Sequence, residues 1–310
     1  MITVRVPATS ANLGPGFDAL GLALRVHNTL TLEPALEPEI EIEGEGAGVL
    51  PRDASHLAYQ AAMAVLARSR DYDVPVDGPL ESIGGQAFRL RQHNRIPLAR
   101  GMGSSAAAII AGAVGANALL GGPLDRQAIV DLATEMEGHP DNVAPALLGG
   151  LVVCTRGAGG VRWMRLAPPP LKVVLAVPDY HVSTLEARRR LPARVPFPDA
   201  VFNVTRTALL VAALTGGRPD LLDEATQDRL HQPYREHLVP GLSDVFSAAR
   251  RAGAYGVALS GSGPAVLAFG DAPEIGPAMA GAFEAAGAAC RILHAECDIE
   301  GAVVGGAPGA

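Results

Sequence analysis

The sequence predicts an α+β fold divided into two domains. The chain has 310 residues, and a single domain commonly takes about 100 to 200 of them. Short β-rich runs alternate with Ala-rich runs of helical period. A stretch rich in Gly and Pro at residues 157–170 interrupts this pattern. We therefore expect one domain at residues 1–160, a second at 161–304 and a flexible tail at 305–310.

The first half of the chain supplies both kinds of element. An alternating run at residues 2–6 predicts the first strand, and similar runs at 25–32 and 86–91 predict two more. Ala-rich runs at 54–68 and 105–120 predict helices, since alanine has the highest helix propensity. This half is therefore expected to fold as α plus β.

The second half repeats the mixture. Apolar runs at residues 171–178, 255–260 and 265–270 indicate strands. Helical runs at 198–214 and 274–286 lie between or after them. We expect a sheet backed by helices.

Charge and composition argue against two kinds of partner. The net charge is −7, so the chain lacks the basic surface that neutralises nucleic-acid phosphates. The uncharged stretch 102–124 contains several Gly, an Asn and a Pro, which favours a buried helix over a membrane span. No signal peptide is evident at the N-terminus, and the three cysteines form no CxxC pair. We expect a cytoplasmic protein with reduced thiols and no nucleic-acid or membrane partner.

A glycine-rich segment followed at once by a helix is the strongest single signal. Glycines let the backbone approach a phosphate, and the N-terminus of the helix offers free N–H groups and a positive dipole end. The serines could cap the helix or ligate Mg²⁺; a tight turn with an ordinary cap is the alternative. The missing Lys excludes a Walker A motif, and the spacing excludes a Rossmann fingerprint. The segment consists of Pro97, Leu98, Ala99, Arg100, Gly101, Met102, Gly103, Ser104, Ser105, Ala106 and Ala107.

Three motifs, in this order along the chain, resemble those of the GHMP kinases in their homoserine kinase form. Residues 7–21 read PATSANLGPGFDALG, like the first family motif. Residues 97–107 read PLARGMGSSAA, like the phosphate loop, and residues 256–265 read GVALSGSGPA, like the C-terminal glycine-rich loop. Mevalonate and galactose kinases have a Lys or Arg near the start of the first motif, whereas this segment is uncharged until Asp18. The resemblance covers nearly the whole chain.

This resemblance implies a fold, an activity and partners. The fold is an N-terminal domain like the second domain of ribosomal protein S5 and a C-terminal ferredoxin-like domain. The activity is ATP-dependent phosphorylation of L-homoserine to O-phospho-L-homoserine in threonine biosynthesis, with Mg²⁺, by a homodimer. The implied ATP contacts are residues 97–107 together with Gly261, Ser262 and Gly263.

A polar segment that reads EMEGHPDNVAP resembles the H-x-D-N-V-A motif of homoserine kinases. The resemblance implies that Glu135 binds Mg²⁺ together with Ser105, and Glu137 is the near alternative. Several GHMP kinases have a general-base Asp where this chain has Asn142. An amide cannot accept the proton, so the resemblance implies direct transfer, with Asn142 holding the substrate hydroxyl. Asp141 competes as a base, and both readings stay open.

The substrate itself sets requirements on its site. Homoserine carries a carboxylate and an ammonium group, so it needs a guanidinium and an acidic or amide group. Arg188 and Arg235 lie in segments that resemble those of the family's carboxylate-binding arginines. By the same resemblance, Asn12, Asp18 and His139 complete the pocket, with Asp18 suited to the ammonium.

The sequence leaves open one arginine assignment, the adenine contacts and two alternative functions. Arg189 and Arg190 directly follow Arg188, so that assignment can shift by a residue. His56 stands where homoserine kinases usually have Asn near the adenine, which leaves the adenine contacts undecided. Two alternative functions are a GHMP kinase for a shikimate or isoprenoid-pathway alcohol, and a non-catalytic sensor of the same fold.

Overall fold

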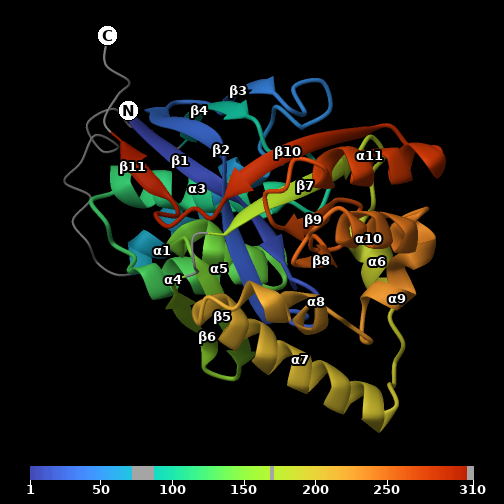
Figure 1. The fold of residues 1–310 in the computed structure, drawn as a ribbon. Coiled ribbons are helices and arrows are strands. Elements are labelled where there is room, and N and C mark those ends of the chain that lie inside the picture. Colours follow the sequence, from blue (N-terminus) through green and yellow to red (C-terminus); the bar gives the residue numbers. More distant parts are fainter. Residues whose placement is uncertain (72–86, 168–170, 306–310) are drawn as a thin grey trace.

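The structure is a computed structural model that describes residues 1–71, 87–167 and 171–305 (Figure 1). Among these residues the larger sheet has seven strands, in the order β11-β1-β2-β4-β3, with β5 beside β2 and β6 beside β5. Strands β3 and β4 are parallel. The strands are β1 (Ile2–Ala11), β2 (Leu20–Ala35), β3 (Glu39–Gly44), β4 (Ala87–Asn94), β5 (Leu151–Gly157), β6 (Gly160–Leu166) and β11 (Val303–Gly305).

A layer of helices packs on one face of this sheet. Helices α3 and α5 contact β1 and β2, while α1 and α4 pack against α3. Helix α3 approaches α1 closely because Gly112 has no side chain; a Cβ there would lie 1.9 Å from the carbonyl oxygen of Ala58. A small residue thus allows the two helices to pack at short backbone distance. The helices are α1 (Leu57–Asp71), α3 (Ser104–Leu119), α4 (Arg126–Glu137) and α5 (Pro140–Leu148).

The second sheet has four antiparallel strands in the order β10-β7-β9-β8. The central strands, β7 and β9, are the first and third of this sheet along the chain, and helices precede β8 and β10, which is the ferredoxin-like arrangement. Helices α10 and α11 pack on one face. The elements are β7 (Lys172–Pro178), α10 (Leu242–Arg251), β8 (Gly256–Leu259), β9 (Val266–Phe269), α11 (Ile275–Ala285) and β10 (Cys290–Glu296).

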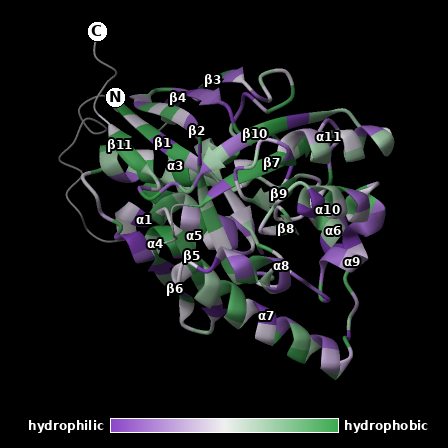
Figure 2. Cartoon of the chain, in the orientation of Figure 1, coloured by the Kyte–Doolittle hydropathy of each residue, from purple (hydrophilic) through white to green (hydrophobic). Residues whose placement is uncertain are grey.

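Strand β7 joins the two hydrophobic cores. Alternate side chains of a strand point to opposite faces of its sheet. Val173, Leu175 and Val177 belong to the core of the first domain, whereas Val174 and Ala176 pack with α10 and α11. Strand β7 is accordingly hydrophobic along most of its length, whereas the edge strand β3 is largely hydrophilic (Figure 2).

The segment between β7 and α10 is mostly helical. Its longest helix, α7, lies at the lower edge of the view in Figure 1. Glu236–Leu238 and Pro219–Leu221 are 3₁₀ turns. The remaining helices are α6 (Thr184–Arg189), α7 (Phe197–Thr215), α8 (Leu222–Ala225) and α9 (Gln232–Arg235).

The division between the domains differs from the expected position at residue 160. Strand β6 pairs with β5 of the first sheet along its whole length, so we place the division after Leu166. The chain also returns at its end, because β11 pairs with β1. Gly305, expected in the tail, therefore lies in a strand, and residues 306–310 lie outside the described residues.

The predicted strands and helices are confirmed in type and order. Strand β4 begins at Ala87, and Gln86, expected at its start, lies outside the described residues. The polar segment that contains Asp141 and Asn142 forms the first turn of helix α5.

Candidate active site

A cleft of about 510 Å³ lies between the two domains. Residues 98–105 of the glycine-rich loop form one wall, and the loop after β1 forms another. The first turn of α5, residues 181–184 at the start of α6 and residues 261–262 also line it, as do residues 49–51 and 56–57. The cleft therefore brings together the motifs that lie far apart in the sequence.

The glycine-rich loop directs the N-terminus of α3 towards this cleft. Gly101 and Gly103 have φ angles of 73° and 67°, in the left-handed region that favours glycine. A Cβ at Gly101 would lie 2.0 Å from the carbonyl oxygen of Ser260. Among the described residues, no side chain caps α3 at its N-terminus. Its first N–H groups and its dipole are therefore available to an anion.

Most of the expected ATP contacts line the cleft. Residues 98–105 do so, together with Gly261 and Ser262. The cleft lining lacks four of them, Pro97, Ala106, Ala107 and Gly263.

Within the loop, the guanidinium of Arg100 is bonded to backbone carbonyls. Its Nε donates to the Pro178 oxygen at 2.7 Å, and its Nη atoms donate to the oxygens of Leu98 and Asp179 at 2.8 Å each. Arg100 thus fastens the loop to the end of β7, and these contacts leave the backbone, not this side chain, as the main phosphate-binding feature.

A serine and a carboxylate meet beside the loop. Ser105 Oγ donates a hydrogen bond to Glu137 Oε1 at 2.6 Å, and both residues line the cleft. Burial raises the pKa of Glu137, although the hydrogen bond from Ser105 opposes this change. Among the described residues, Glu137 forms no ion pair with Arg, Lys or His. Paired hydroxyl and carboxylate oxygens of this kind suit Mg²⁺.

The structure corrects the expectation for Glu135. Its carboxylate is exposed and forms an ion pair with Arg68, and it does not line the cleft. Residues two apart on an α-helix point in nearly opposite directions, since each residue advances the helix by about 100°. Glu137 faces the cleft at the end of α4, so Glu135 faces away, and Glu137 is the carboxylate that can hold a metal with Ser105.

Two helix ends position the polar segment that contains His139, Asp141 and Asn142. Gly138 ends α4 in a left-handed conformation, and Pro140 is the first residue of α5. His139 lies between them with an extended backbone, φ −149° and ψ 146°, as expected for a residue before proline. The first turn of α5 then places Asp141 and Asn142 in the cleft lining.

The side chains of this segment are already hydrogen-bonded. Thr9 Oγ1 donates to Asn142 Oδ1 at 2.8 Å, so Asn142 keeps its amide N–H groups for another partner. His139 Nδ1 lies 2.7 Å from Asp141 Oδ1. Burial on its own lowers the pKa of His139, but the hydrogen bond to Asp141 and nearby carboxylates outweigh burial and raise it.

An ion pair lies at one end of the cleft. Arg188 donates two hydrogen bonds to Asp18, both at 2.8 Å. Each side chain is more than one third exposed, and such pairs contribute only about 0–1 kcal/mol to stability. Asn12 shapes this loop, since its side chain accepts from the Asp18 N–H and donates to the Gly261 carbonyl.

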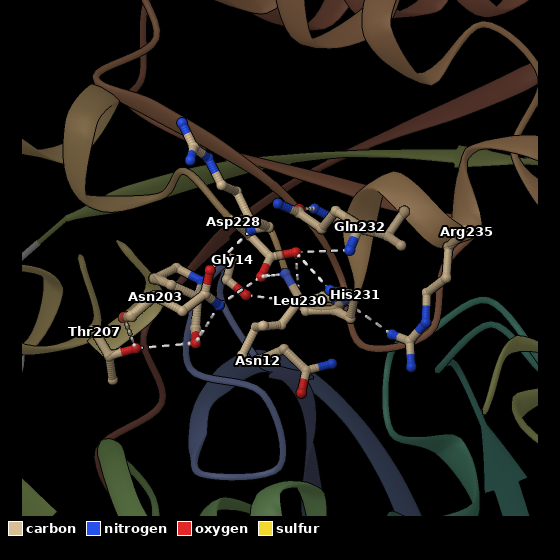
Figure 3. Close-up of polar contacts among 12 residues, drawn as sticks. Asn12, Gly14, Asn203, Thr207, Asp228, Leu230, His231, Gln232 and Arg235 are labelled. Carbon is tan, nitrogen blue, oxygen red and sulfur yellow. Dashed lines mark hydrogen bonds and ion pairs between the residues drawn. The ribbon is translucent and has the colours of Figure 1, made fainter. Parts of the chain in front are cut away.

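Arg235, the other expected arginine, is buried and lies beside His231 (Figure 3). Its Nη1 donates to the Gly261 carbonyl at 3.0 Å and lies 3.1 Å from Nδ1 of His231. Burial, followed by the charge of Arg188, lowers the pKa of Arg235 to about 10. The ring of Phe17 lies against the guanidiniums of Arg188 and Arg235. Its centroid is 5.4 Å from Cζ of each arginine.

His56 lines the cleft near the phosphate loop. It is buried, and among the described residues its Nδ1 has no hydrogen-bond partner. Burial lowers its pKa. A neutral imidazole with one free nitrogen is therefore available on this side of the cleft.

Three residues in or directly behind the cleft were not predicted from the sequence as site residues. Thr9 and Phe17 lie inside the first motif, and His231 lies four residues before Arg235. The four-residue spacing is the usable signal, since it puts two side chains on one face where a helix forms. Nothing in the sequence marks the other two.

The chain is similar to known proteins along nearly its whole length. The model of the GHMP kinases N terminal domain matches residues 56–150, and that of the GHMP kinases C terminal matches residues 210–290. A curated homoserine kinase from Moorella thermoacetica is 51% identical over 98% of this chain and 100% of its own length. One from Carboxydothermus hydrogenoformans is 44% identical over 98% of this chain and 96% of its own.

Solved structures show the same architecture. The crystal structure of homoserine kinase from Cytophaga hutchinsonii superposes with a TM-score of 0.80 at 30% identity, covering 98% of this chain and 96% of that one. An L. major mevalonate kinase superposes with a TM-score of 0.68 at 16% identity, covering 94% of each chain, which is a likeness of fold alone. The expected architecture of two domains is confirmed.

Proposed function

Because the chain belongs to the GHMP kinase family, we propose that it transfers the γ-phosphate of ATP to the hydroxyl group of L-homoserine. It is a phosphotransferase, and the product is O-phospho-L-homoserine. One observation carries the choice of substrate. The cleft that contains the phosphate loop also contains a carboxylate, Asp18, and two arginines, Arg188 and Arg235. These charges complement the ammonium and the carboxylate of an amino acid.

The phosphates of ATP bind at the glycine-rich loop. The uncapped N-terminus of α3 and the loop glycines support this assignment, because backbone N–H groups and the helix dipole stabilise phosphate. Gly261 and Ser262 approach the same region from the second domain. His56, with its free Nδ1, is the candidate contact for the base.

Ser105 and Glu137 hold Mg²⁺ in this proposal. The raised pKa of Glu137 supports it, since a partly buried carboxylate without a cationic partner is stabilised when a cation binds. When bound, Mg²⁺ neutralises part of the charge on the phosphates. Glu135 has no part in this site.

Transfer is direct. The substrate hydroxyl oxygen attacks the γ-phosphorus while the bond to the bridging oxygen breaks and ADP leaves. Asn142 holds the hydroxyl through its amide N–H groups, since Thr9 occupies its Oδ1. The hydroxyl proton passes to a phosphate oxygen or to water. Asp141, already bonded to His139, is the competing base.

The substrate replaces the ion pair at the end of the cleft. Its ammonium takes the place of Arg188 beside Asp18, and its carboxylate binds Arg188 and Arg235. The exposure of the Asp18–Arg188 pair supports this exchange, because a solvent-exposed pair is weak. Asn12 and His139 complete the pocket around the substrate.

The reaction belongs to threonine biosynthesis in the cytoplasm. The chain's three cysteines, Cys154, Cys290 and Cys297, are free thiols, which supports a reducing compartment.

The assembly is a homodimer that pairs through α7. Phe197, Val201 and Val204 are 80%, 45% and 70% exposed on one side of this helix. The two charged residues of α7 are engaged within the chain, Asp199 with Arg229 and Arg206 with Glu224. The exposed apolar stripe is therefore free of unpaired charge, and two antiparallel copies of it would be self-complementary about a two-fold axis.

Helix α7 also has the length and hydropathy of a membrane span, and only 22% of its apolar window is buried. The side of α7 that faces the protein favours a protein interface over a membrane span. Asn203 and Thr207 donate hydrogen bonds to the Pro15 carbonyl, and insertion into lipid would break them.

The test measures Mg²⁺-dependent ADP release from ATP by the purified protein with L-homoserine, L-serine, L-threonine, shikimate and mevalonate. We expect turnover with L-homoserine to exceed that with each other alcohol. Preferential turnover of shikimate or mevalonate would make the chain a different GHMP kinase. ATP binding without turnover of any alcohol would make it a sensor.

A further inference from the structure

His231 lies behind Arg235 and outside the expected set of substrate contacts. Its side chain is fully buried, and it does not line the cleft. Its Nε2 lies 2.6 Å from the carbonyl oxygen of Gly14, in the loop of the first domain that also carries Asp18. His231, a residue of the second domain, thus contacts both the loop after β1 in the first domain and Arg235 at the end of α9 (Figure 3).

The partners of His231 determine which nitrogen carries the hydrogen. The Gly14 carbonyl can only accept, so Nε2 is the donor. The Arg235 guanidinium can only donate, so Nδ1 is the acceptor. Both conditions hold only for the neutral ring protonated at Nε2. Burial lowers the pKa of His231 and agrees with the neutral form, although Asp228 and Asp18 act in the opposite direction.

Asp228 holds the backbone that carries His231. It accepts N–H groups from Leu230, His231 and Gln232 at 2.9, 3.0 and 2.6 Å, and the side-chain amide of Asn203 at 2.7 Å. The start of α9 is therefore fixed before the helix presents Arg235. The imidazole also lies beside the ring of Phe17, with 5.2 Å between centroids.

Arg235 has few other constraints. Among the described residues it forms no ion pair, and its Nε is buried without a hydrogen-bond partner. Within the described part of the chain, only the Gly261 carbonyl and His231 bond to its guanidinium. A buried cation with so few contacts is stabilised by a carboxylate that enters the cleft.

We propose that His231 is a positioning residue that aims the guanidinium of Arg235 at the carboxylate of the substrate. The neutral ring accepts from Nη1 of Arg235 while its own N–H anchors it to the loop that holds the substrate ammonium. His231 thereby sets the distance between the two charged ends of the pocket. This role rests on the proposed function, because it requires an amino-acid substrate.

The experiment compares wild type with His231→Leu and His231→Asn. Leucine removes both hydrogen bonds, whereas the Asn side-chain oxygen can replace Nδ1 as the acceptor for Arg235. We expect His231→Leu to raise KM for L-homoserine about tenfold, which corresponds to loss of one or two hydrogen bonds. KM for ATP stays within twofold, and His231→Asn recovers part of the affinity. Thr207→Val is the matched control, because Thr207 bonds to the same loop at Pro15 without touching Arg235, and its KM stays at the wild-type value.

A substrate without a carboxylate separates positioning from general damage. With 3-aminopropan-1-ol, wild type and His231→Leu should have equal kcat/KM, because Arg235 has no carboxylate to bind. An equal loss with both substrates, or an unchanged KM for L-homoserine in the folded variants, would overturn the role of His231. Absence of homoserine turnover in wild type would instead overturn the proposed function and this inference together.

Discussion

Glu135 and Glu137 stand two residues apart near the end of α4, and their surroundings differ. Glu135 is exposed and paired with Arg68, whereas Glu137 is partly buried and bonded to Ser105. The difference follows from the rotation of the helix between the two positions. At the scale of single residues, the site is therefore decided by the face on which a side chain lies, not by its type.

Replacing Glu137 with Gln should disable the metal site. We expect kcat/KM to fall roughly 100-fold or more, because the neutral amide is a weaker ligand. The Mg²⁺ concentration that gives half-maximal activity should rise for the same reason. Without Mg²⁺, the unfolding temperature should stay equal or rise, since burial disfavours the ionised carboxylate. Kinetics against Mg²⁺ concentration and calorimetry measure these effects.

Glu135→Gln is the matched control for this change. It removes a carboxylate two residues away that pairs only with Arg68 at the surface, so activity should stay within about twofold of wild type. A large loss with Glu135→Gln and none with Glu137→Gln would reverse the assignment.

At the scale of elements, the glycine-rich loop and the start of α5 touch through one glycine. A Cβ at Gly103 would lie 1.9 Å from Thr9 Oγ1 and 3.1 Å from Asn142 Oδ1. Strand β1, the glycine-rich loop and α5 therefore meet at Gly103, beside the proposed place of phosphate transfer.

Gly103→Ala should lower kcat about 10- to 100-fold, because the new methyl group displaces Thr9 and with it Asn142. Gly121→Ala is the control: Gly121 has φ of 82° but open space around its Cβ position. Both variants bear a left-handed backbone cost of roughly 1–2 kcal/mol, so only the clash distinguishes them. Equal kcat values for the two variants would contradict the contact argument.

Helix α7 is the element that carries the proposed dimer interface. Its 19 residues span roughly 28 Å, long enough for the core of an interface. Val204→Asp should convert the dimer to a monomer, because the charge would be desolvated in the interface. Sedimentation velocity measures the change. Met164→Asp, at another exposed apolar position, should remain dimeric; a dimeric Val204→Asp would place the interface elsewhere.

At the scale of the whole molecule, the chain closes on itself. After β10 it crosses back to the first sheet, where β11 pairs with β1. Asp298 holds this crossing: it accepts the N–H groups of Glu300 and Gly301 and pairs with His27 at 2.7 Å. Burial on its own raises the pKa of Asp298, but these hydrogen bonds outweigh it and lower the pKa.

Asp298→Asn should therefore destabilise the protein in a pH-dependent way. A carboxyl group whose pKa is lowered by folding contributes stability above its unfolded pKa, about 3.9, and this contribution disappears as pH falls through the folded value. We expect a loss of about 1–3 kcal/mol at pH 7 that shrinks below about pH 4. Denaturant unfolding at several pH values measures it. Exposed Glu37→Gln is the control, and a pH-independent loss in Asp298→Asn would contradict the argument.

Periodicity predicted part of the strands and helices, and the three motifs predicted the architecture through their family resemblance, because both are local signals. Ser105, Asp18 and Asn142 were named from such motifs, and all three line the cleft; their roles stay predictions. The choice between Glu135 and Glu137 depends on the direction each faces on α4, which a motif does not specify. His231 depends on the approach of Gly14, 217 residues away.

The return of the chain was missed for a similar physical reason. Strand β11 has only three residues, Val303–Gly305, too few to show a period. Its pairing with β1 depends on contacts across almost the whole chain. Strand β6 was placed in the wrong domain for another reason: the Gly-rich turn between β5 and β6 joins the two strands of one hairpin.

The most direct test of the central claim is ³¹P NMR of the purified protein with ATP, Mg²⁺ and L-homoserine. We predict a phosphomonoester signal that grows in step with loss of the γ-phosphate of ATP and coincides with authentic O-phospho-L-homoserine. Formation of inorganic phosphate alone, or no change while ATP remains bound, would contradict the claim.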